Sequence, residues 1–238
     1  MKIIYLHHSG FVVELDKNTL IFDAITYIQP QFLKKGRRKY FFASHAHTDH
    51  FSQIIYNYGT DFDTRYILSD DITRRGGKKT TFIKPYEHLH YDDIKCGPVE
   101  IDTFGSTDQG VSFLVQAEGK VIFHAGDLNW WDWSPDTRPE IDRAAEERDY
   151  KAEIAKIKDF LETNHRKINV AFVPVDSRLG RSATKAAEYF VDELHPQILA
   201  PMHCWDEYSV VTDLQQACYG KDVKILTMSK RNEIIYSD

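Results

Sequence analysis

Residues 44–50 of this chain concentrate side chains that commonly bind metal ions. Four of them, three histidines and one aspartate, fall in the pattern H-x-H-x-D-H directly after the apolar run 40–43. That run predicts a buried strand. Because side chains alternate between the two faces of an extended segment, His45 and His47 are expected to project in the same direction.

The second half of this stretch predicts the start of a helix. Apolar residues recur at helical spacing over 51–58, and Thr48 is a plausible N-cap. Asp49 and His50 would then lie in the first turn and point away from the histidine pair. Solvated loop histidines would explain a single histidine well, but they explain this pattern poorly. The corner therefore predicts two ligand sets for two adjacent metal ions.

The pattern of His45, His47, Asp49 and His50 resembles the first metal motif of the metallo-β-lactamase superfamily. It looks most like a branch of metal-dependent hydrolases that includes ascorbate-phosphate lactonases. The resemblance implies an α/β fold, a four-layer αββα sandwich, that covers essentially the whole chain.

Hydrophobic patterning along the chain is compatible with that fold. Alternating and apolar runs predict strands over 2–7, 11–15, 19–23, 40–43, 65–68, 81–84, 86–91, 99–104, 111–116, 120–123, 169–174, 197–200, 223–228 and 233–236. Helical spacing predicts a short helix over 30–35, a long helix with its apolar stripe at residues 154–161, and helices over 183–194 and 209–219. No linker, low-complexity tract or repeat divides the sequence, so we expect one hydrolase domain over residues 1–238.

Composition narrows the classes of partner and compartment. The formal net charge of −6 does not favour nucleic-acid binding, which usually needs a basic face. The sequence shows neither a secretory leader nor an apolar run long enough to span a membrane. Three scattered cysteines suit a reducing cytoplasm better than a disulfide framework. We therefore expect a cytoplasmic protein with a small-molecule substrate, and a homo-oligomer is compatible with the sequence.

Two further segments end apolar strands with potential ligands, Asp127 and His203. Taken alone, Asp127 could be a capping residue and His203 a hydrogen-bonded core histidine. The resemblance implies instead that Asp127 bridges two ions and that His203 is the final ligand. In that arrangement His45 and His47 hold the first ion, and the second ion is held by Asp49, His50 and His203.

One departure from the family pattern concerns the first ion. The family usually supplies a further histidine from a loop before a mid-chain strand, but here residues 105–110 contain none. Asp108 could replace it and would make the site richer in oxygen ligands. Asp108 could equally be a turn residue that bonds its own backbone. His124, three residues before Asp127, is the other candidate for this ligand, but it is expected to pack beneath the site.

Several other side chains could contact a substrate. His8 lies in a turn where the family often has a residue near the floor of the active site, but a turn histidine bonded to the backbone is as plausible. Arg178 or Arg181 could bind a phosphate or carboxylate, or form surface salt bridges. Three tryptophans follow Asp127 closely, Trp130, Trp131 and Trp133. They could form an aromatic wall of the substrate site, or they could pack in the core. Cys204 is expected to pack in the core and not to act as a nucleophile.

These observations predict a hydrolase that uses two divalent metal ions, most plausibly Zn²⁺ or Mn²⁺. Metal-bound hydroxide would cleave an ester, lactone or phosphodiester bond of a small anionic metabolite. Asp49 would accept the proton of the attacking water and return it to the leaving group. The alternative is a metal-binding or regulatory module with an impaired first site and little turnover.

Overall fold

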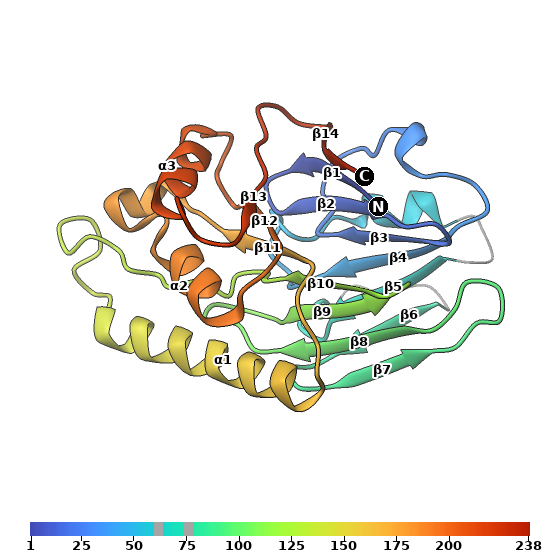
Figure 1. Ribbon diagram of the computed structural model, residues 1–238, viewed down its shortest axis with the longest axis horizontal. Coiled ribbons are helices and arrows are strands. Elements are labelled where there is room, and N and C mark those ends of the chain that lie inside the picture. Colours follow the sequence, from blue (N-terminus) through green and yellow to red (C-terminus); the bar gives the residue numbers. More distant parts are fainter. Residues whose placement is uncertain (60–63, 74–78) are drawn as a thin grey trace.

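The computed structural model describes residues 1–59, 64–73 and 79–238. Its strands form two seven-stranded sheets that pack against each other (Figure 1). The strand order is β14-β1-β2-β3-β4-β5-β6 in the first sheet and β13-β12-β11-β10-β9-β8-β7 in the second. The arrangement confirms the predicted α/β fold with two central sheets.

The elements lie close to the predicted ranges. The first sheet consists of β14 (Glu233–Ser237), β1 (Lys2–His7), β2 (Gly10–Glu14), β3 (Asn18–Phe22), β4 (Arg38–Ala43), β5 (Thr64–Ser69) and β6 (Thr80–Ile83). The second consists of β13 (Lys224–Ile225), β12 (Ile198–Met202), β11 (Val170–Pro174), β10 (Lys120–His124), β9 (Ser112–Ala117), β8 (Val99–Phe104) and β7 (His88–Tyr91). The helices are α1 (Arg143–Thr163), α2 (Lys185–Leu194) and α3 (Ser209–Ala217), with 3-10 helices η1 (Pro30–Phe32), η2 (Gln53–Tyr58) and η3 (Ser177–Ser182).

Aromatic side chains from both sheets fill the space between them. Phe11 of β2 stacks on Phe172 of β11 with ring centres 4.1 Å apart. Phe42 of β4 meets Phe113 of β9 at 5.2 Å. All four rings are at most 1% exposed, and burial of one such side chain contributes about 1.5–3 kcal/mol. These contacts hold the two sheets, and therefore the loops at their edges, in a fixed relation.

The two outer layers differ in kind. Helices α1, α2 and α3 lie on the side of the second sheet (Figure 1). Asp142 caps the start of α1, because its side chain accepts hydrogen bonds from two backbone N–H groups. Among the described residues, the outer face of the first sheet is covered by loops with η1 and η2. The helix predicted over 30–35 is only the three-residue η1, because Leu33 leaves the helical region with φ −121° and ψ 70°. No helix in the described ranges combines the length and apolarity needed to cross a membrane.

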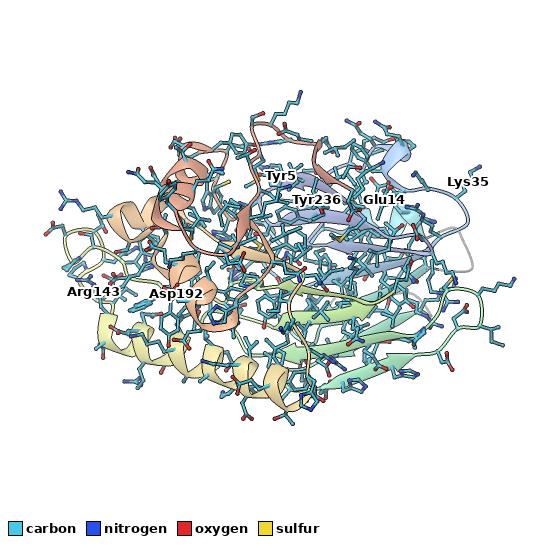
Figure 2. All side chains as sticks on the ribbon, viewed as in Figure 1. Tyr5, Glu14, Lys35, Arg143, Asp192 and Tyr236 are labelled. Atoms are coloured by element: carbon cyan, nitrogen blue, oxygen red, sulfur yellow. The ribbon has the colours of Figure 1, made fainter. Side chains whose placement is uncertain are left out.

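Strand direction decides at which edge the loops meet. In the first sheet β3 and β4 are parallel, and in the second β10, β11 and β12 are parallel. Lys35, just before β4, and Glu14, the last residue of β2, lie toward one end of the molecule, whereas Arg143 at the start of α1 lies toward the opposite end (Figure 2). Because β4 runs away from Lys35, the loop that follows β4 lies on the side of the molecule opposite Lys35 and Glu14.

Candidate metal centre

The carboxyl ends of these parallel strands bring the candidate ligands together. Asp23 follows β3, and residues 44–50 follow β4. In the second sheet, residues at or just beyond three neighbouring strand ends are Asp127, Asp176 and His203. Ligand sites in open sheets form at such edges because parallel strands end side by side there.

The start of the helix predicted at Thr48 is wrong: residues 45–50 form bends and a turn, and the helical part begins only at Gln53, as the 3-10 helix η2. The His47 carbonyl accepts hydrogen bonds from the N–H groups of His50 and Phe51, at 3.0 and 2.8 Å. The chain is then extended at Ser52, which caps η2 by accepting a bond from Ile54 N–H. This tight turn folds the motif back on itself, so that the rings of His45 and His50 lie 4.2 Å apart.

Asp127 lies at the centre of the site and is 4% exposed. Its Oδ2 is 3.4 Å from His45 Nε2. Its Oδ1 is 3.1 Å from His50 Nε2 and 3.5 Å from His203 Nε2. One carboxylate oxygen therefore faces His45, and the other faces His50 and His203.

The potential ligand atoms form three overlapping groups, and within each group they lie within 4.8 Å of one another. The groups are His8, Asp49, His50 and His203; His45, His50 and Asp127; and His47, Asp108 and Asp127. The structure thus brings together every residue that the sequence analysis proposed as a metal ligand, and adds His8.

Unpartnered polar atoms show that this donor set fits a cation. His8 Nε2, His50 Nε2 and Asp127 Oδ1 are buried and make no hydrogen bond. Buried polar groups are nearly always satisfied, so atoms left without a partner need an explanation such as an ion. Imidazole nitrogen and carboxylate oxygen together suit Zn²⁺ and also Mn²⁺.

Two aspartates that the sequence analysis did not assign hold the imidazoles in place. Asp23 Oδ2 lies 2.7 Å from His50 Nδ1, and Asp176 Oδ2 lies 3.0 Å from His203 Nδ1. Each contact turns the Nε2 atom of its histidine toward Asp127. Carboxylates of this kind fix the ring orientation and raise the basicity of a ligating histidine. The signal in the sequence was weak: each is an acidic residue just after a predicted strand.

The electrostatics of the site favour a bound positive charge. Burial lowers the pKa of His50, but Asp127 and Asp23 outweigh this effect and raise the pKa to about 10. Burial also opposes ionisation of Asp127, yet His50 and the neighbouring histidines hold the pKa of this carboxyl well below its usual range. Burial lowers the pKa of His8 to about 4, so this imidazole is neutral and able to donate a lone pair. Metal binding would release the proton of His50.

Comparisons with known proteins agree with this fold. No family model matches the chain. The YhfI protein of Bacillus subtilis, described as a metallo-β-lactamase fold protein, superposes with a TM-score of 0.58 over 98% of this chain and 99% of its own, at 12% identity. The chain has the metallo-β-lactamase fold.

Two further proteins are similar to this chain over nearly its whole length. The metallo hydrolase Igni18 of Ignicoccus hospitalis superposes with a TM-score of 0.64 over 98% of this chain and 97% of its own, at 16% identity. A metal-dependent hydrolase of Pyrococcus abyssi is 22% identical over 250 residues, which are 98% of this chain and 99% of the relative.

In this metallo-β-lactamase fold, the loop before β9 carries Asp108 to the site. Gly110 makes that approach possible: its φ is +72°, and a Cβ there would lie 2.0 Å from the Ser44 carbonyl oxygen. The Asp108 carboxylate groups with His47 and Asp127, and the loop turn is closed by a bond from the Asp108 backbone N–H to Ser106 Oγ at 3.2 Å. Its position is compatible with both predicted roles, ligand and turn residue.

His124 and His8 take different places. His124 Nε2 bonds the Ser9 carbonyl oxygen at 2.8 Å, and its Nδ1 accepts a bond from Gly126 N–H at 3.2 Å. Both nitrogens are therefore used beneath the site, as the sequence predicted. His8, in contrast, has its ring centre 4.2 Å from that of His203 and its Nε2 3.5 Å from Asp49 Oδ2. Its side chain is part of the site, which the sequence analysis had left open.

A cleft of about 460 Å³ opens beside the ligands. Trp131 and Trp133 line it, whereas Trp130 is buried against Tyr150 and Lys185. Of the two alternatives that the sequence left open, core packing describes Trp130, and an aromatic wall describes Trp131 and Trp133. Of the two arginines considered, only Arg178 lines the cleft.

Two other residues near the site have structural positions. Cys204 is buried, and burial raises the pKa of its thiol to about 11, which agrees with the expectation that it packs in the core. Asp132 ties the tryptophan loop to the helices by accepting hydrogen bonds from Arg143, Ser182 and Lys185.

Proposed function

We propose that this protein is a metal-dependent hydrolase that cleaves an ester, lactone or phosphodiester bond of a small anionic molecule. The observation that carries the proposal is the position of Asp127, one of whose oxygens faces His45 while the other faces His50 and His203. A bridging carboxylate of this kind is what a pair of adjacent divalent cations needs. The similarity to a metal-dependent hydrolase of Pyrococcus abyssi supports the reaction class.

The two candidate ion positions share Asp127 and otherwise use different residues. One would be held by His45, His47, Asp108 and Asp127, and the other by His50, His203, Asp49, Asp127 and His8. A pair of divalent cations held by these residues, Zn²⁺ or Mn²⁺ by this donor set, would supply a water with a pKa lowered toward neutrality and would polarise the scissile bond.

Asp49 is the residue best placed to move a proton. Its side chain is 29% exposed and lines the cleft, and its Oδ2 lies 4.0 Å from the Nε2 atoms of both His50 and His203. His8 Nε2 lies 3.5 Å from Asp49 Oδ2, and this proximity, together with His50, holds the pKa of Asp49 well below its usual range, so the carboxylate is ionised at neutral pH. It can accept a proton from an attacking water and pass it to a leaving group at the cleft.

Metal analysis combined with a substrate screen tests the proposal. We expect about two divalent ions per chain in protein purified without chelators. We also expect hydrolysis of at least one class among simple esters, lactones and phosphodiesters, lost on chelation and restored by Zn²⁺ or Mn²⁺. One ion or none, with no turnover in any class, would support a metal-binding or regulatory module instead. A lactone preference would support the resemblance to ascorbate-phosphate lactonases.

The role of Asp108 has a separate test. If Asp108 is a ligand, Asp108→Ala should lower the metal content from two ions to about one and reduce kcat, because the first position would retain only His45, His47 and Asp127. Asp136→Ala is a matched control, since Asp136 is an exposed loop aspartate outside the cleft. Unchanged metal stoichiometry in Asp108→Ala would identify Asp108 as a turn residue only.

A further inference from the structure

The wall of the cleft contains side chains that metal binding does not require. Beyond the ligands it includes three tryptophans and two arginines, Trp131, Trp133, Trp205, Arg138 and Arg178. Trp205 is 45% exposed, which is unusual for so large an apolar side chain. Trp131 is 8% exposed, and its indole Nε1 has no hydrogen-bond partner. Exposed aromatic surface at a cleft is typical of a surface that contacts a ligand.

Arg178 is held in place by three neighbours. Asp176 accepts hydrogen bonds from its Nε and Nη2 atoms. Its guanidinium carbon lies 4.6 Å from the ring centre of Trp205 and 5.4 Å from that of Trp133. Among the described residues no hydrogen bond uses Nη1. A braced guanidinium with a free N–H edge is well suited to bind a carboxylate or phosphoryl oxygen.

Charge is distributed unevenly around the cleft. Arg138 also stacks on Trp133, at 5.1 Å, so two guanidinium groups contact one indole. Asp108 and Glu146 also line the cleft. The pKa of Glu146 is raised, mainly by burial and to a smaller extent by the charges of nearby carboxylates. An anionic group in the cleft would therefore be repelled by Asp108 and Glu146 and attracted by Arg138 and Arg178.

This charge pattern and the indole surface together point to one class of substrate. Resting on the hydrolase function proposed above, we propose that the cleft selects molecules that carry a planar aromatic ring and a separate anionic group. The ring packs against Trp133 and Trp205, and the carboxylate or phosphoryl oxygen accepts a hydrogen bond from Nη1 of Arg178. Arg181, on the same 3-10 helix, does not line the cleft and takes no part.

Calorimetric titration of the metal-loaded chain with three probes tests this selectivity. Phenylphosphonate has ring and charge, methylphosphonate has charge only, and benzyl alcohol has a ring only. We expect phenylphosphonate to bind about tenfold or more tightly than methylphosphonate, because both phosphonates can contact metal but only one reaches the indoles. Arg178→Gln should weaken both phosphonates by about tenfold and leave benzyl alcohol unchanged. Arg181→Gln, the matched control, should change none of the three.

A second variant isolates the aromatic contact. Trp133→Ala should weaken phenylphosphonate about tenfold more than it weakens methylphosphonate, because its indole both packs on the probe's ring and contacts Arg178. Tyr219→Ala, which removes an exposed aromatic ring elsewhere, should have no effect. Metal content is measured for every variant, because Arg178 also contacts Asp176. If Arg178→Gln loses metal, the Trp133→Ala titrations decide the outcome.

Two results would overturn the proposal. One is equal affinity of phenylphosphonate and methylphosphonate; the other is Arg178→Gln with full metal content behaving like Arg181→Gln. Failure of the hydrolase function is distinguishable, because it would appear as absent metal or absent turnover in the unmodified chain. Loss of selectivity alone would leave metal content and hydrolysis of simple neutral esters intact.

Discussion

Asp127→Asn is expected to abolish hydrolysis and to remove metal from both positions while the fold persists. Asparagine keeps the shape of the side chain but removes the negative charge that faces His45 on one side and His50 and His203 on the other. Stabilisation by the bound ions is worth several kcal/mol in the transition state, so kcat/KM should fall by about 1,000-fold or more.

Metal analysis, kinetics and circular dichroism of the same preparation check this expectation. Asp213→Asn is a suitable control, because Asp213 is an exposed aspartate on α3 and its change should leave metal content and rate unaltered. Retention of both ions and of more than a tenth of the wild-type rate by Asp127→Asn would show that Asp127 does not bridge the site.

Asp23→Asn is expected to have a large effect although Asp23 contacts no candidate ion position. The side chain is 1% exposed and accepts hydrogen bonds from Ser44 N–H at 2.8 Å and from Ser44 Oγ at 2.7 Å. It also holds His50 through Nδ1. The amide would retain part of this network but present N–H groups to other donors. We expect metal affinity to fall about 10- to 100-fold and the free energy of unfolding to fall by about 2–4 kcal/mol.

Chelator-competition titration gives the metal affinity, and urea unfolding of the chelator-treated protein gives the stability without the contribution of bound metal. The two measurements separate positioning of His50 from general destabilisation. Wild-type metal affinity in a destabilised Asp23→Asn protein would assign Asp23 to the turn at Ser44 alone. Wild-type stability with weakened metal binding would assign it to His50 alone.

Most strands and the central motif could be predicted because their signal is local. The meander β1–β3 and the strands β8–β10 show alternating or apolar runs bounded by turn residues, and period alone defines such elements. The helix expected from Thr48 begins only at Gln53, as η2. Its apolar spacing is helical, but the turn closed by the His47 carbonyl carries the motif across the edge of the sheet before η2 begins.

The sequence also could not predict which side chains line the cleft. Three tryptophans within four residues indicate aromatic packing, but their spacing does not tell which rings face the core. Trp130 packs on Tyr150 because α1 and α2 lie beneath it, whereas Trp131 and Trp133 stack on each other at the cleft. Arg178 and Arg181 are likewise equivalent in sequence, and only the turn of η3 separates them.

By itself, the sequence determined most strands and the residue types that form the candidate metal centre, since both depend on short-range patterns of polarity and ligand spacing. The two-sheet sandwich was expected only from the resemblance to the metallo-β-lactamase superfamily. Only the tertiary structure decided that His8 joins this centre, that Asp23 and Asp176 orient His50 and His203, and that Arg178 faces the cleft. These relations join strands far apart in the chain, and they depend on parallel strands ending at a common edge, which no local pattern encodes.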